Sequence, residues 1–504
     1  MSAVGSILTN TGALQALNAL SNTTATNNSL ESELSSGLSI NSPADNPAGY
    51  ITAQGFTSQL NGLTQATSNA NQAVSLLQTA DGAITQQIGI VQQLNSIAVQ
   101  AANGTQTSAE SQSLQNLVSQ LSSQVTTIAK QTQFNNINLL DGSFSGVQFQ
   151  VGANNGQTQT LSISNLTASA IGLNATSVSG SAVYGTNVNA TSAALTTGTA
   201  ATIGSGTAGK FTKSTSSATD LNVTGQNGGT AKVAVNSAQE SAASLADAIN
   251  NVSGSTGVQA QATTSITLKL TAGANGGYSF NIQSATGAGS AASGIGKAQT
   301  INASSAAQVV SQINGQSANS GVVASLDKSG NLVLTQTSGE NINITGTSSG
   351  SLTTLGTTPT TISKAGTASA VIQGQVQFQS SGAFTVGNSS AVGLASKSSL
   401  TSLSSIDVST TSGAATAINV VKYALGALNN QGGQLGAVQQ ALTANINNSN
   451  TTAQNLTTAL GVVQDANIPA VSNQLTEAEI QAQSGVAALK SSTQLQQSYL
   501  SLLP

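Results

Sequence analysis

Side chains that commonly carry out chemistry are scarce in this 504-residue chain. It contains no His, Cys, Trp or Arg, and all 11 basic residues are Lys. Thiol nucleophiles, His general bases and the usual zinc ligands are therefore missing, as is a bidentate Arg clamp for phosphate. We expect no catalytic residue, no metal site and no cofactor, and we predict that the protein is not an enzyme.

Two carboxylate pairs and one Gly-rich segment come nearest to a reactive site. Glu31 and Glu33, like Glu477 and Glu479, are two residues apart, and positions two apart on a helix do not face each other. Solvated helix faces explain both pairs better than acid–base chemistry. Residues 294–298 end like a phosphate loop, but positions 291 and 298 are Ala, where such a loop needs Gly and Ser or Thr.

Composition limits the class of protein further. Charged residues make up 5% of the chain, against roughly 25% in ordinary soluble proteins, and the net charge is −4. Scattered Lys residues do not provide the basic face that nucleic acid requires. No segment approaches the ~20 apolar residues of a membrane span. The N-terminus lacks the basic and apolar regions of a secretory signal peptide.

The chain divides into three zones that differ in sequence pattern. Residues 1 to about 140 and about 411 to 504 show helical periodicity, whereas about 175 to 400 is rich in Gly, Ser, Thr and Ala with short alternating apolar runs. The pattern predicts a fold that is mostly α at both termini, with paired long helices in a coiled-coil-like bundle. Between them we expect a β-rich, α+β middle region.

A seven-residue apolar spacing marks one face of the C-terminal arm. Such a spacing over six steps is typical of a coiled-coil seam, although an ordinary helical bundle shows it too. The seam residues are Val421, Leu428, Leu435, Leu442, Ser449, Leu456 and Val463. One face of the N-terminal arm carries Leu14, Leu17, Leu20, Leu30, Leu34 and Leu38. The apolar residues of both faces, together with Leu500, are candidate assembly contacts.

Turn residues divide the helical zones. Pro43 and Pro47 bracket a turn after the first arm. A long amphipathic helix is expected next, ending near Asn103-Gly104, then a helix over about 108–130 and a strand within Phe144–Val151.

The middle region contains an internal repeat. Ala248-Ile249-Asn250 corresponds to Gln312-Ile313-Asn314, and Thr256-Gly257-Val258 to Ser320-Gly321-Val322, with a constant offset of 313 − 249 = 64 residues. Each copy, about 236–284 and about 300–348, predicts a short helix, a Gly turn and strands with one apolar face. Two copies make a pair of small α+β modules.

Several segments in fixed order resemble the bacterial flagellin family. They are Leu34–Gly49, Gln59–Ala66, Gln78–Ala83, Ala98–Thr105, Gln131–Asn135 and Phe149–Asn154 on the N-terminal side, and Leu435–Gln439 and Leu500–Leu503 on the C-terminal side. The resemblance covers about 1–175 and 405–504, and motifs at both ends make it specific.

The resemblance implies an architecture and a function. Residues 1–44 and 465–504 are expected in the inner tube of a filament, 45–175 and 405–464 in a helical outer-tube domain with a small β-hairpin region, and 176–404 in a surface-exposed variable domain. The implied function is that of a structural subunit that polymerises into the extracellular flagellar filament for swimming. Export unfolded through the flagellar type III system, without a cleaved signal, is expected.

The resemblance also implies partners. These are further copies of the chain, the flagellar cap and hook–filament junction proteins, an export chaperone that binds the C-terminal arm, and the export apparatus.

The chain departs from the family at charged positions. The family usually has Arg where Ser39, Gln93 and Asn95 stand here. Its receptor-recognition surface lies on the same stretch, so the resemblance implies weak sensing by the flagellin-specific Toll-like receptor. The candidate residues of this degenerate surface are Gln93, Asn95, Ser96, Ile97 and Leu117. Few charges also suggest a polymer that resists acid, because carboxylates titrate near pH 4 and amides do not; the alternative is a generally low-charge surface protein.

Three other classes of protein share part of the pattern. A hook–filament junction protein has similar terminal helices, but the match through 59–154 favours flagellin. A flagellin with an inserted metalloprotease needs a His-Glu-x-x-His helix, and the chain has no His. An unrelated Ser/Thr-rich adhesin does not explain two matched helical ends.

Overall fold

The computed structural model describes residues 10–176, 203–205, 220–226, 228–234, 241–274, 276–285, 297–355, 361–363, 369–372, 374–389 and 395–500. They belong to two compact units. The first comprises Met1–Thr79, Ser145–Ser162 and Gln434–Pro504, and the second comprises Ala80–Phe144 and Ile163–Gly433.

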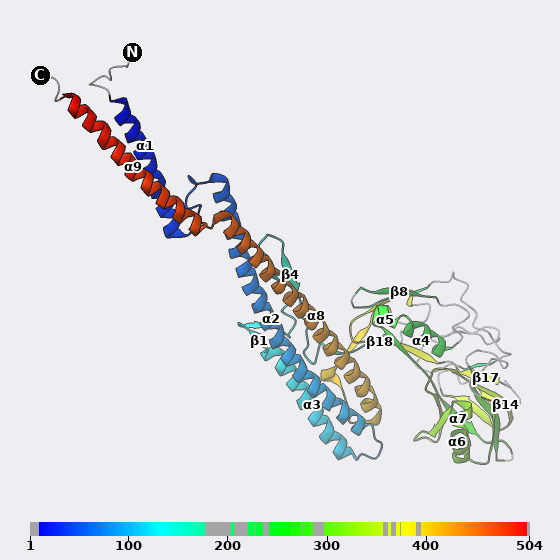
Figure 1. Ribbon diagram of the computed structural model, residues 1–504. Helices are drawn as coiled ribbons and strands as arrows, with labels where there is room; N and C mark the ends of the chain where they lie inside the picture. Colours follow the sequence, from blue (N-terminus) through cyan, green and yellow to red (C-terminus); the bar gives the residue numbers. More distant parts are fainter. Residues whose placement is uncertain are drawn as a thin grey trace. The chain divides into compact units, whose positions relative to one another are not determined.

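Long helices form both ends of the chain, and most strands lie between them in the sequence (Figure 1), which confirms the expected fold class. On the N-terminal side they are α1 (Thr11–Ser36), α2 (Pro47–Ala101) and α3 (Ser108–Gln131), and on the C-terminal side α8 (Thr411–Gln464) and α9 (Ile468–Leu500). The ends of α2 and α3 lie where the sequence pattern predicted them.

Local hydrogen bonds explain where these helices begin and end. The Thr107 hydroxyl accepts from the backbone N–H of Glu110 at 3.3 Å, and the Glu110 carboxylate accepts from the N–H of Thr107 at 2.7 Å, so α3 starts with a capping box. Helix α2 starts at Pro47, and Asn46 Oδ1 accepts from the N–H of Gly49 at 3.0 Å. Helix α1 ends at Ser36 and is capped by Gly37, whose φ is 74°.

A small hairpin belongs to the first unit. Its strands are β3 (Val147–Gln150) and β4 (Thr158–Leu161), and Asn69 of α2 donates to the carbonyl of Gln150 at 3.1 Å. Strand β3 lies inside the range that alternation predicted.

Two sheets and their helices dominate the second unit. The larger sheet has the order β12-β13-β9-β18-β5-β20, with β15 and β16 off this path, and the five-stranded sheet has the order β11-β10-β14-β17-β6. The larger sheet consists of β5 (Gly172–Ala175), β9 (Gln259–Thr271), β12 (Val323–Leu326), β13 (Leu332–Gln336), β15 (Ser351–Thr354), β16 (Thr361–Ser363), β18 (Gln375–Ser380) and β20 (Ser399–Ser402). The five-stranded sheet consists of β6 (Ile203–Ser205), β10 (Tyr278–Ala285), β11 (Gln299–Ala303), β14 (Asn341–Ser349) and β17 (Ser369–Ile372).

Shorter elements complete the second unit. They are β1 (Gln133–Phe134), β2 (Ile137–Asn138), β7 (Leu221–Thr224), β8 (Thr230–Val233), β19 (Thr385–Gly387), α4 (Ala242–Asn250), α5 (Ser253–Thr256), α6 (Ala306–Gly315), α7 (Ser317–Ser320) and the 3₁₀ helix η2 (Leu403–Ser405).

Strands of the two repeat copies pair with each other. In the β9–β13 pair Leu268 lies opposite Leu332, and in the β10–β14 pair Asn281 lies opposite Thr345. In both cases the opposed residues are separated by the repeat offset. Apolar side chains of both copies form one core, which includes Ile266, Leu268, Phe280, Ile282, Val309, Ile313, Leu332, Leu334, Ile342 and Ile344.

The copies differ at one turn. In the second copy Asp327 accepts from the N–H groups of Ser329 and Asn331 at 2.8 Å, which closes a hairpin between β12 and β13. The first copy has Thr263–Thr267 at the equivalent positions, and β9 continues through them as one strand. Residues 235–240, where the first copy begins, lie outside the described residues.

Candidate assembly surface

Helices α1 and α9 run side by side and antiparallel (Figure 1). Ser492 donates through its hydroxyl to Asn10 Oδ1 at 3.2 Å, Gly485 faces Leu20, and Leu30 shares a small apolar cluster with Val471 and Ala478. Four α9 residues that meet α1, namely Val471, Ala478, Gly485 and Ser492, are therefore seven residues apart in turn. Small side chains at this spacing let the two backbones approach each other.

Backbone hydrogen bonds join the turn after α1 to the link before α9, at one end of this helix pair. The N–H of Ser39 donates to the carbonyl of Gln464 at 2.7 Å, and the N–H of Ala466 donates to the carbonyl of Gly37 at 2.9 Å. Leu38 and Asp465 form an antiparallel bridge between these bonds. The turn after α1 is thus bonded to the link between α8 and α9, although 425 residues separate Ser39 from Gln464.

Large apolar side chains remain exposed on the paired helices. Leu14 and Leu17 of α1 are 56% and 51% exposed, and Ile480 and Leu495 of α9 are 59% and 55% exposed. Close to the bridge, Val462 is 82% exposed. Exposed apolar residues gathered on one pair of helices are typical of a surface that a partner covers.

The residues expected in the assembly faces divide into three groups. Leu14, Leu17 and Leu34 are exposed, and Leu20 and Leu38 are half-buried, whereas Leu30 is buried against α9. On α8 four apolar seam residues are buried inside this chain and leave no surface for another copy; they are Val421, Leu428, Leu435 and Leu442. Leu456 and Val463 are half-buried, and the side chain of Leu500 lies outside the described residues.

Sequence reasoning missed the apolar α9 residues Ile480, Val486 and Leu495, and Val462 of α8. They stand off the seven-residue row, and no second period marks them. The small residues Ala478, Gly485 and Ser492 follow a seven-residue spacing of their own on α9, but a search for apolar residues passes over them.

The candidate receptor surface is only partly exposed. Gln93 and Ser96 on α2 and Leu117 on α3 are exposed, and Asn95 is half-buried. Ile97 is only 9% exposed, so little of its side chain is available to this surface. The helical period turns Ile97 to the buried side with Leu94 and Ala98.

Several carboxylates accept hydrogen bonds from nearby residues of the same turn. The backbone N–H groups of Ser42 and Asn41 hold the pKa of Asp45 below its usual value, and those of Thr107 and its hydroxyl do the same for Glu110. Three further carboxyls have a lowered pKa, and in each the largest cause is a hydrogen bond from a nearby side chain. Ser143 donates to Asp141, Asn331 to Asp327 and Ser409 to Asp407. Each donor lies within four residues of its carboxylate.

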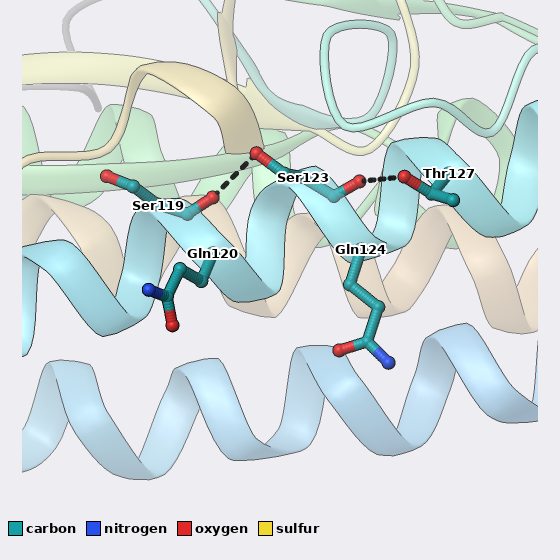
Figure 2. Close-up of a pocket in the computed structure, with 5 residues that line it drawn as sticks. All are labelled: Ser119, Gln120, Ser123, Gln124 and Thr127. Atoms are coloured by element: carbon teal, nitrogen blue, oxygen red, sulfur yellow. Dashed lines mark hydrogen bonds between the residues drawn. The ribbon is translucent and has the colours of Figure 1, made fainter.

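The surface hollows contain amides and hydroxyls instead of reactive groups. Figure 2 shows one on α3, lined by Ser119, Gln120, Ser123, Gln124 and Thr127. The Ser123 and Thr127 hydroxyls donate to carbonyls one turn earlier, both at 2.9 Å. Within the described residues, no three His, Cys, Asp or Glu side chains lie where they could hold a metal ion. None of the described helices combines the length and hydrophobicity of a transmembrane span.

Comparison with known proteins matches both helical ends. The family model of the bacterial flagellin N-terminal helical region matches residues 7–145, and that of the C-terminal helical region matches residues 418–503. A B-type flagellin of Pseudomonas aeruginosa is 32% identical over 97% of this chain and 98% of its own. A flagellin of Escherichia coli is 40% identical over 32% of this chain and 29% of its own. Among solved structures, FliC from Burkholderia pseudomallei is 18% identical, and the match covers 73% of this chain and 99% of that structure, with a TM-score of 0.27.

Proposed function

Because the chain belongs to the bacterial flagellin family, we propose that its copies join through the exposed faces of α1 and α9. The protein is a structural subunit of the extracellular flagellar filament and not an enzyme. We further propose that the filament serves swimming, and that the chain is exported unfolded through the flagellar type III system without a cleaved signal.

The observation that carries the assembly proposal is the apolar surface left on α1 and α9. Only Leu30 on α1, and Val471 and Ala478 on α9, are buried among the described side chains of these helices. Burying exposed Leu14 and Leu17 against other copies gains about 25 cal/mol per Å² of apolar surface. Helices that gain their burial from neighbours fold fully on assembly, which suits export as an unfolded chain.

Membership of the flagellin family supports the following proposed regions and partners. Residues 1–44 and 465–504 form the inner tube, 45–175 and 405–464 the outer tube, and 176–404 the exposed variable region. In support of the first boundary, α1 ends at Ser36 and α9 begins at Ile468. The proposed partners are other copies, the cap and hook–filament junction proteins, the export apparatus, and a chaperone that covers the C-terminal arm before export.

Polymerisation of purified monomer tests the assembly proposal. Electron micrographs of the full chain should show long filaments, and a chain lacking 1–40 and 465–504 should form none. Short rings or monomers from the full chain would instead favour a junction protein, since such proteins share the terminal helices.

We also propose that the receptor surface is degenerate at Gln93, Asn95, Ser96 and Leu117. Neutral side chains there remove the ion pairs that charged residues would offer a receptor. Reporter cells carrying the flagellin-specific Toll-like receptor should respond weakly to this protein, at least tenfold below a flagellin with Arg at the positions of Gln93 and Asn95. An equal response would contradict the proposal.

A further inference from the structure

In each repeat copy the Asn of the Ile-Asn pair binds one strand residue twice. Asn250 donates through Nδ2 to the carbonyl of Ala260 at 3.0 Å and accepts at Oδ1 from the N–H of Ala260 at 2.8 Å. Asn314 makes the same two bonds to Ala324, at 2.8 and 2.7 Å. One side-chain amide thus does for the strand residue what a residue of a neighbouring strand does in a ladder.

Both strand residues lie where the larger sheet is open. Ala324 is in β12, which ends the strand order of this sheet among the described residues. Ala260 is in the first half of β9 and is paired with Phe378 of β18 on one side. On the other side of β9 the pairing with β13 begins only at Thr264, so the flank at Ala260 is unpaired by any described strand.

The rest of the motif holds the Asn in place. Ile249 and Ile313 are fully buried, and they fix the helix from which each Asn extends. Gly257 and Gly321 have φ values of 68° and 70°, a conformation that favours Gly and turns the chain back toward the strand. In each copy, the Ile-Asn and Gly-Val pairs therefore together position the two hydrogen bonds between the Asn and its strand residue, which we call the clamp.

A free edge in this region is a hazard. Val323 and Leu326 on β12 are 49% and 39% exposed, and an apolar edge strand with open N–H and C=O groups is a template for pairing with another chain. Filament subunits are identical and closely spaced, so every edge would meet many others of the same kind.

We propose that Asn250 and Asn314 are edge guards: their amides occupy the hydrogen-bonding positions that a strand from a second copy of this chain would otherwise take. This role is separate from assembly through α1 and α9. The guards keep the middle regions of neighbouring copies from pairing strand to strand.

The full-length Asn314→Ala chain tests the proposal as a monomer, before polymerisation is induced. Light scattering after size exclusion should give at least twice the monomer mass, rising with protein concentration, and the Ala324 amide should remain protected from hydrogen exchange by its new partner. Asn319→Ala removes an exposed Asn from the adjacent short helix and is the matched control; it should stay monomeric.

A second variant separates edge pairing from unfolding. Lys on an edge strand opposes strand addition, so Asn314→Ala with Val323→Lys should return to the monomer mass. Val323→Lys alone should also be monomeric. The proposal is overturned if Asn314→Ala stays monomeric, or if its association persists in the double variant, since that would mean aggregation of unfolded chains. Neither result bears on filament formation, which is measured separately.

Discussion

Two buried glutamines bind neighbouring residues of one loop in the second unit. Gln87 of α2 donates through Nε2 to the carbonyls of Val125 and Leu166 at 3.0 and 3.3 Å, and Gln431 of α8 accepts at Oε1 from the N–H of Ser164 at 3.1 Å. Gln87 Oε1 and Gln431 Nε2 have no partner among the described residues.

Replacing Gln87 with Leu should destabilise the protein. The change keeps a similar volume but removes two hydrogen bonds from a fully buried position, and we expect a loss of about 1–3 kcal/mol in the free energy of unfolding. Urea denaturation followed by circular dichroism measures it. Gln86→Leu, at the exposed neighbouring position, is the control and should change little. Equal effects of the two variants would mean that the amide bonds of Gln87 carry no stability.

The turn after α1 should open in acid. The N–H groups of Ser42 and Asn41 lower the pKa of the Asp45 carboxyl in the folded chain. The stability that this carboxylate gives the turn is therefore complete above the pKa of the unfolded chain, near 4, and is lost as the pH falls through the lower pKa of the folded chain. NMR shifts of the amide protons of Asn41 and Ser42 should move below pH 4. The Asp45→Ala chain should lack this transition, and a midpoint at or above pH 4 would contradict the assigned cause.

Among the elements, α1 and α9 combine two kinds of apolar residue. Leu30 is buried between them, whereas Leu17 is 51% exposed. Leu30→Ala should loosen the helix pair in the monomer by about 2 kcal/mol, the low end for a Leu in a small cluster. Leu17→Ala should leave the monomer unchanged and raise the protein concentration needed for polymerisation.

Hydrogen exchange on monomers and sedimentation of polymers measure the two effects. The proposed assembly surface fails if Leu17→Ala polymerises at the same concentration as the unaltered chain.

Periodicity predicted the helices well and their partners poorly. Spacing alone located α3, because its apolar residues recur every three or four positions from Leu114 to Ile128. The seven-residue row on α8 was equally clear, but a row does not say what covers it, and Leu428 and Leu435 are covered by this chain. The bridge between Leu38 and Asp465, and the pairing of β5 with β20, join residues far apart in sequence and have no local signal.

The partners of Asn250 and Asn314 in the clamps were likewise not predictable from the sequence. The repeat revealed the two Asn residues as equivalent, but not what they bind. Their partners, Ala260 and Ala324, lie ten residues further on, and an Ala in a strand carries no mark of an unpaired edge.

For the whole molecule, scarcity of charge predicts a filament that persists in acid. The carboxyls with lowered pKa accept hydrogen bonds from within four residues of themselves, so their protonation loosens turns without separating helices; they are Asp45, Glu110, Asp141, Asp327 and Asp407. Filaments held for an hour at pH 3 and then sedimented should stay in the pellet. A flagellin filament of ordinary charge content is the control, and equal release of monomer from both would contradict the prediction.

The register between the two repeat copies has a further consequence. Leu268 faces its own counterpart Leu332, and Asn281 faces Thr345, its counterpart in the second copy. A contact in which equivalent positions meet is the contact of a symmetric dimer. Joining both halves in one polypeptide converts that dimerisation into an intramolecular step, with an effective concentration on the order of millimolar for a short connection. The module pair therefore forms at any dilution, including that of a single isolated chain.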